Sequence, residues 1–198
     1  AKVRKLVMVG APIDLAAAHC GLSADAEATP LTVFQGLVNS GNGLVIGRSI
    51  AKFWGNPTDT KHVHEILRTA HPIGSPEFTQ LEASFRKWNS WTIDVPGKYY
   101  LEVVEKLYKR NELAGGNFVA LGQRIDLAQL RLPIYLLAGS ADDVVAPEQA
   151  LALQRLVGTA PEALCHQVAP CNHLSLFMGR RTLEEYWPAI VRWLKQAD

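Results

Sequence analysis

Two short stretches of the chain, residues 6–9 and 133–138, are apolar throughout and end at Gly10 and Gly139. Continuous apolar runs of this length are typical of strands buried on both faces of a parallel sheet. A third short strand is predicted near residues 164–168. Helical patterns separate these strands, and this alternation indicates an α/β fold built around a parallel sheet flanked by helices.

The clearest helical pattern follows Asp94-Val95-Pro96, where Asp94 suits an N-cap and Pro96 an early helical position. Its apolar stripe runs over residues 100–108, and Gly115-Gly116 is expected to end the helix. Two further helices are predicted, one from Pro147 to about residue 157. The other opens with Thr182 and Glu185 in capping-box spacing and is interrupted or restarted at Pro188.

Between about residues 20 and 90 the pattern loosens into helix-like pieces joined by glycines and prolines. We interpret this stretch as a largely helical cap inserted into the α/β domain, which itself covers residues 1–198. Cap helices joined by glycine-rich connections can close over a site, so we expect the insertion to act as a lid. Several aromatic residues in this stretch or just after it could line an acyl channel, although a packing role is the simpler interpretation: Trp54, Trp88, Trp91, Tyr99 and Tyr100.

The formal net charge of +1 gives no electrostatic argument for binding nucleic acid or an anionic membrane. No apolar run approaches the ~20 residues of a membrane span, and the first residues lack the apolar region of a signal peptide. Three irregularly spaced cysteines argue against a disulfide framework. We therefore expect a cytoplasmic protein.

The stretch AGSADDVVAP places Asp142 and Asp143 where a buried strand ends, and His173 follows the next strand. Because sites in parallel sheets lie beyond the carboxyl ends of the strands, these side chains can meet there. They match the acid and the histidine of an α/β-hydrolase triad, whose chain order is nucleophile, acid, histidine. We assign Asp143 and His173 as catalytic, with Asp142 as a loop-capping carboxylate or the alternative acid.

No Gly-x-Ser-x-Gly or Gly-x-Cys-x-Gly motif occurs in the 198 residues. In the hydrolase order, the nucleophile precedes the strand at residues 6–9. We therefore expect this chain to be the C-terminal part of a longer enzyme and to be inactive on esters by itself. The exposed sheet edges that this implies favour pairing with another chain, including a homo-oligomer.

The segment VMVGAPID resembles one that follows the nucleophile region in intracellular polyhydroxybutyrate depolymerases. The segment from YYLEVVEKLYKRNEL through RIDLAQLRLPIYLLAGSADDVVAP is similar to a region that these enzymes share with polyhydroxyalkanoate synthases, as are HLSLFMG and WPAIVRWL. The resemblance implies an α/β-hydrolase fold and carries the triad aspartate onto Asp143 and the histidine onto His173. It is patchy from about residue 20 to 85.

The resemblance implies acyl transfer through a covalent acyl-enzyme, with no cofactor. GAPID and LFMG favour hydrolysis of intracellular poly(3-hydroxybutyrate) or a related polyhydroxyalkanoate, whereas WNSWTIDVPGKYY favours the synthase, an acyltransferase. We prefer the depolymerase. The third hypothesis is a non-catalytic hydrolase-like domain that binds polymer granules or a partner. The implied partner is the polymer or a hydroxyacyl oligomer, and the implied location includes its granules.

Metal binding is the weaker interpretation of two histidine and cysteine groups. His62 and His64 would share a face only on a strand, and their segment has helical character. The second group, Cys165, His166, Cys171 and His173, fits no common zinc spacing. Cys171 precedes His173 by two residues but follows the predicted acid, so it is interpreted as loop packing. We predict no metal site.

Overall fold

The computed structural model describes residues 3–53 and 60–196. Trp54, one of the cap aromatics considered above, lies outside the described residues. Within these residues, no helix combines the length and apolar character that crossing a membrane requires.

Three parallel strands form the main sheet, in the order β1 (Leu6–Val9), β6 (Ile134–Gly139) and β7 (Leu164–Ala169). These are the three strands predicted from the sequence. The register pairs Leu6 with Ile134 in one ladder and Gly139 with Ala169 in the other. Strands β6 and β7 therefore end side by side, and the loops that carry the predicted acid and histidine leave the sheet together.

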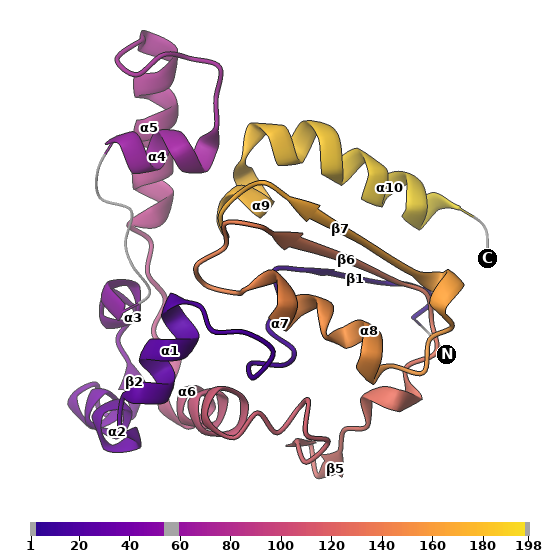
Figure 1. Cartoon of the computed structure of the whole chain (residues 1–198). Coiled ribbons are helices and arrows are strands. Elements are labelled where there is room, and N and C mark those ends of the chain that lie inside the picture. The colour runs from indigo at the N-terminus through magenta and orange to yellow at the C-terminus, as the bar shows by residue number, and fades with distance from the viewer. Residues whose placement is uncertain (1–2, 54–59, 197–198) are drawn as a thin grey trace.

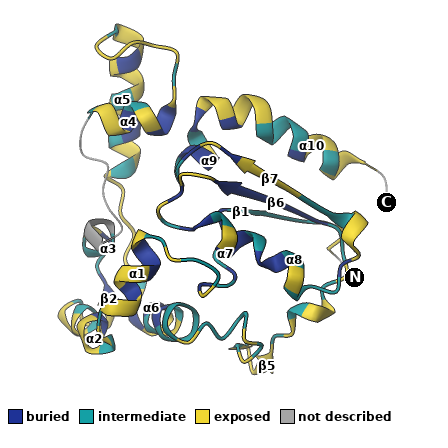
Figure 2. Ribbon diagram, in the orientation of Figure 1, coloured by how far each residue is buried: buried dark blue, intermediate teal, exposed yellow. Residues whose placement is uncertain are grey.

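Strand β6 is buried along its whole length because helices cover both faces of the sheet (Figures 1 and 2). Alternate side chains point to opposite faces. Tyr135 and Leu137 pack toward α9 (Ser175–Met178) and α10 (Trp187–Lys195), while Ile134 and Leu136 pack toward α7 (Pro147–Leu151) and α8 (Leu153–Leu156). The sheet thus holds the two site loops on a rigid base.

The segment from α1 to η1 gathers beyond the carboxyl ends of the strands (Figure 1). We call it the cap. Its elements are α1 (Gly21–Ala28), α2 (Leu31–Ser40), β2 (Leu44–Val45), α3 (Gly47–Phe53), α4 (Thr60–Leu67), α5 (Pro76–Asn89), β3 (Val95–Pro96), α6 (Gly97–Glu102) and the π-helix η1 (Val103–Lys109). The cap therefore extends past the predicted limit near residue 90, because α6 and η1 pack with α2 in one apolar cluster.

Short elements connect the cap to the sheet and complete the chain. They are β4 (Val119–Ala120), β5 (Gln123–Arg124), the 3₁₀ helices η2 (Leu127–Gln129) and η3 (Pro161–Ala163), and the π-helix η4 (Thr182–Tyr186), which runs directly into α10. The predicted helix from Pro147 is present as α7 and α8, with a turn at Ala152 between them.

The predicted ends of the helix after Asp94 are wrong. The Asp94 carboxylate instead accepts a hydrogen bond from the Gly47 backbone N–H at 2.9 Å, at the start of α3. The helix stops at Lys109, well before Gly115, because Asn111 takes the left-handed conformation with φ +48°. The Asn111 side chain then binds Asp14 at 2.7 Å, so tertiary contacts fix this terminus.

The capping box predicted at Thr182 is also absent. Thr182 is buried within the helical run, and its hydroxyl points to the Cys171 sulfur at 3.7 Å. Glu185 pairs with Arg181 one turn earlier instead. The restart at Pro188 is confirmed, since this proline lies in the first turn of α10.

Candidate functional site

The loop after β6 is fastened to the loop after β7 by backbone hydrogen bonds. Ser140 N–H donates to the Ala169 carbonyl at 2.8 Å, and Ala141 N–H donates to the Cys171 carbonyl at 3.2 Å. Gly139 permits this approach, because a Cβ there would lie 2.5 Å from the Cys171 oxygen. The two loops consequently behave as one rigid unit at the sheet edge.

The Asp142 carboxylate is completely buried, with 0% of its side chain exposed, and each of its oxygens has a defined partner. Oδ1 accepts hydrogen bonds from the backbone N–H groups of Val144 at 2.9 Å and Val145 at 2.8 Å. Oδ2 lies 2.9 Å from Nδ1 of His173. A buried carboxylate is costly to desolvate, and these three hydrogen bonds offset that cost.

The prediction that Asp143 faces His173 is therefore wrong, and Asp142 takes this position. The prediction assumes that the carboxylate nearer the turn is the rigid one. An Asp that opens a turn instead accepts from the N–H groups two and three residues ahead, and Asp142 is placed to do so. Asp143 is exposed, and its backbone carbonyl accepts from Leu22 N–H at 3.4 Å.

His173 faces Asp142 with one ring nitrogen and keeps the other on the opposite side of the ring. Because an ionised carboxylate can only accept, Nδ1 carries the proton and Nε2 is left basic. The His173 side chain is 23% exposed, and the edge of its ring meets Phe177 with 5.7 Å between ring centroids. The arrangement can take a proton at Nε2 and stabilise the resulting imidazolium through Asp142.

Gly10, at the end of β1, forms the floor beneath His173. Its φ is +53°, and a Cβ at this position would lie 3.1 Å from Cε1 of His173 and 3.0 Å from Leu176. From the sequence, Gly10 is evident only as a strand end. The sequence signal for its role is a glycine directly after a buried strand, at the edge of the sheet where the site is expected.

Cys171 is buried, and burial raises the pKa of its thiol, which keeps it protonated at neutral pH. Its packing against Thr182 agrees with the structural role predicted for it. His62 and His64 lie on α4, where residues two apart do not share a face, and His64 contacts the Phe78 ring. The described residues contain no group of three or more His, Cys, Asp or Glu side chains arranged to hold a metal ion.

A parallel sheet flanked by helices, with an acid and a histidine on consecutive strand ends, defines the α/β-hydrolase class. Solved structures agree on the fold: a monoacylglycerol lipase from Paleococcus ferrophilus gives a TM-score of 0.53 at 18% identity, covering 98% of this chain and 59% of that one. A mutant of an epoxide hydrolase from Bacillus megaterium gives a TM-score of 0.53 at 14% identity, covering 98% and 61%.

The family model described as PHB de-polymerase C-terminus matches residues 60–198, and the chain belongs to this family. Curated relatives share about a quarter of their aligned residues with this chain. The poly(3-hydroxyalkanoate) polymerase subunit PhaC of Allochromatium vinosum is 24% identical, covering 98% of this chain and 54% of the relative. The PhaC of Haloferax mediterranei is 25% identical, covering 68% and 27%. The chain thus spans only about a quarter to a half of these two relatives.

These relatives are named as polymerase subunits, so they support the synthase alternative better than the preferred depolymerase. They do agree with the wider prediction of an α/β-hydrolase linked to polyhydroxyalkanoates.

Proposed function

We propose that Asp142 and His173 are the acid and base of a poly(3-hydroxyalkanoate) polymerase-type acyltransferase. The observation that carries this proposal is the 2.9 Å contact between His173 Nδ1 and a fully buried carboxylate. The names of the curated relatives supply the substrate class. The acyl donor is then a hydroxyacyl thioester, and the acceptor is the hydroxyl end of a growing polyester.

The chemistry follows from the geometry of the imidazole. Nε2 of His173 takes the proton of a Ser or Cys nucleophile, which attacks the acyl carbonyl; Nε2 then returns this proton to the leaving thiol. In the second half, Nε2 takes the proton of the acceptor hydroxyl, which attacks the acyl-enzyme; Nε2 then returns this proton to the departing Ser or Cys, and the enzyme regains its starting state. Asp142 keeps Nδ1 protonated throughout. The nucleophile belongs, in the hydrolase chain order, to the strand before β1.

Ester hydrolysis is the second candidate, because water can replace the polymer hydroxyl as the acceptor. The cap bears on this choice, since a lid that excludes water favours transfer to the polymer. It lies beyond the strand ends that carry Asp142 and His173 (Figure 1), and we propose that it serves as this lid. A non-catalytic role in binding granules is the third candidate.

The test uses the full-length enzyme that contains this chain, with 3-hydroxybutyryl thioester as substrate. Asp142→Asn should lower turnover roughly 10⁴-fold, as loss of the acid does in a serine-protease triad. Asp143→Asn is the matched control, because it removes the same charge from the adjacent, exposed position. It should change turnover only a few-fold.

The product separates the candidates. Thiol release accompanied by polymer supports the acyltransferase, whereas free hydroxyacid released from added polymer supports the hydrolase. Equal losses in the two Asp variants, or a larger loss for Asp143→Asn, would refute the assignment of Asp142. Full activity of folded Asp142→Asn would also refute the role of Asp142, whereas absence of both reactions in the wild-type enzyme would leave only the binding role.

A further inference from the structure

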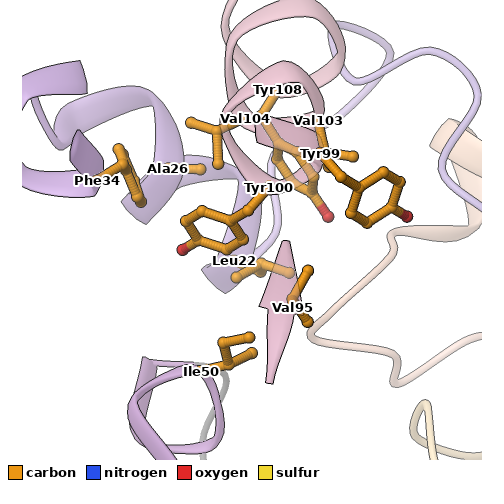
Figure 3. A pocket seen from close by; sticks show the side chains of 10 residues that line it. All are labelled: Leu22, Ala26, Phe34, Ile50, Val95, Tyr99, Tyr100, Val103, Val104 and Tyr108. Atoms are coloured by element: carbon orange, nitrogen blue, oxygen red, sulfur yellow. The ribbon is translucent and has the colours of Figure 1, made fainter. Parts of the chain in front are cut away.

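The cap encloses an apolar pocket of about 150 Å³ that the proposed chemistry does not use. Helices α1, α2 and α3, strand β3 and the α6–η1 helix all contribute to it. Its lining is Leu22, Ala26, Phe34, Ile50, Val95, Tyr99, Tyr100, Val103, Val104 and Tyr108, as Figure 3 shows. An engineered cavity of about this volume in another protein is large enough to admit benzene, so the space suits a small apolar group.

One wall of the pocket is hydrogen-bonded to the loop after β6, which carries Asp142. Leu22 contributes its side chain to the lining, and its N–H donates to the Asp143 carbonyl at 3.4 Å. Two residues before Leu22, the Cys20 thiol donates a hydrogen bond to the Val144 carbonyl at 3.1 Å. The pocket is therefore joined directly to the turn that holds the Asp142 carboxylate.

The opposite wall is the α6–η1 helix, which changes from α-helical to π-helical hydrogen bonding at Val103. The wider π turn lets side chains four and five residues apart share a face, and Tyr99, Val103, Val104 and Tyr108 do so here. π-helical turns are rare and are often found at functional sites. Figure 3 shows the Tyr100 ring beside Leu22 and the Tyr99 ring turned to the other side of the helix.

Tyr108 lies between this pocket and a second, polar cavity of about 290 Å³. Tyr108 therefore contributes to the lining of both cavities. Burial raises the pKa of Tyr108 to about 12. Tyr99, 63% exposed, lies at the solvent end of the pocket.

We propose that this pocket binds the alkyl side chain of a hydroxyacyl unit and so sets the chain length that the enzyme accepts. The inference rests on the proposed function for its ligand class, and on the pocket for its size and apolar character. Each buried methylene is worth about 0.8 kcal/mol, or roughly a fourfold preference. A substrate whose alkyl side chain fills the pocket is then bound more tightly than one whose side chain leaves it empty.

The experiment narrows the pocket with Ala26→Leu, at a buried lining position on α1. Ala24→Leu is the matched control, because Ala24 is exposed on the same helix. The ratio of kcat/KM for 3-hydroxyoctanoyl to 3-hydroxybutyryl thioester should fall roughly tenfold in Ala26→Leu and stay unchanged in Ala24→Leu. Val104→Ala widens the pocket and should raise this ratio of kcat/KM values. This second variant still tests the proposal if Ala26→Leu does not fold.

A binding measurement keeps this proposal separate from the proposed function. Methyl 3-hydroxyoctanoate should stabilise the wild-type protein against heat more than methyl 3-hydroxybutyrate, and Ala26→Leu should remove the difference. If the enzyme shows no acyl transfer but the longer ester still stabilises it more, the proposed acyltransferase function is refuted and binding of the alkyl chain in this pocket is supported. If the enzyme is active but neither Ala26→Leu nor Val104→Ala changes the ratio of kcat/KM values or the stabilisation by the two esters, the assignment of this pocket to the alkyl chain is refuted.

Discussion

A single carboxylate organises the turn after β6, and the identity of that carboxylate follows from backbone hydrogen bonding. Asp142 uses one oxygen for two N–H groups of its own turn and the other for His173. The sequence predicts that an aspartate at this strand end meets His173, which is correct. The sequence does not show which of the two adjacent aspartates does so. Side chains alternate between faces only within a strand, and both aspartates lie beyond the end of β6.

Gly10 offers a direct test of how closely the floor of the site fits the imidazole. Gly10→Ala forces a Cβ to within 3.1 Å of the His173 ring and imposes a left-handed conformation that costs an alanine about 1–2 kcal/mol. We expect the full-length enzyme to lose turnover at least tenfold, because the ring must shift. Urea unfolding and kcat report the two effects separately.

Gly43→Ala is the control for this change. Gly43 also has a positive φ, +91°, but a Cβ there meets nothing within 4 Å. It should lower stability by a similar amount and leave kcat unchanged. If both variants lose turnover equally, backbone strain and not contact with His173 is responsible.

At the scale of the elements, buried strands are predicted well and helix ends poorly. A strand such as β6 is specified by its own apolar run, because both of its faces must be covered. Helix ends depend on contacts from distant residues. Asp94 binds the start of α3, and Asn111 reverses the backbone where it meets Asp14. No local pattern encodes those partners.

The junction between α4 and α9 ties the cap to the histidine loop. The Ser175 hydroxyl, fully buried, donates to the Ile66 carbonyl at 2.6 Å, and Leu174 and Met178 pack with the apolar side chains of α4. Ser175→Ala leaves that carbonyl without its partner and should cost about 1–2 kcal/mol. Hydrogen exchange should show faster opening of α4 in this variant, while the sheet stays protected.

Ser84→Ala is the matched control for Ser175→Ala. The Ser84 hydroxyl is exposed and binds the Gln80 carbonyl within the same helix at 3.0 Å. Its loss should leave hydrogen exchange in α4 unchanged. The free energy of unfolding should change by no more than a few tenths of a kcal/mol. Unchanged exchange in Ser175→Ala would show that apolar packing alone holds the junction.

For the whole molecule, the buried phenol of Tyr108 makes stability depend on pH in the alkaline range. Its pKa is about 12 in the folded protein and 10.0 when exposed, so the native state holds a proton that the unfolded state releases. Stability is therefore complete below pH 10 and falls as the pH rises toward 12, by roughly 2–3 kcal/mol from this group. Urea unfolding at stepped pH should show a shallower decline in Tyr108→Phe.

Tyr99→Phe is the control for this measurement, because it removes a phenol that folding leaves mostly exposed. Its decline in stability should match that of the wild-type protein. An identical decline in all three proteins would mean that Tyr108 is solvated in solution, and it would also weaken the case for a closed apolar pocket.

At this scale the sequence indicates the α/β class and the helical character of the cap, but not how far the cap extends. Loose periodicity and glycines suggest an insertion, yet only packing shows that α6 and η1 belong with it. Tyr100 and Val104 form one cluster with Phe34, which lies more than sixty residues away in the chain. Contacts of this range cannot be read from a stripe on one helix.

The buried Gln149 has a mechanical consequence. Its side-chain amide donates to the Ala18 carbonyl at 2.7 Å and to Ser23 at 3.2 Å, while its backbone carbonyl accepts from Ile13 and Asp14. This side chain, fully buried on α7, clamps the start of α1 to the helix that follows the Asp142 turn. If the cap serves as the proposed lid and opens by moving α1, this clamp transmits the movement to α7 and to the turn that precedes it. The position of the cap and the placement of the Asp142–His173 pair are then coupled through one buried amide.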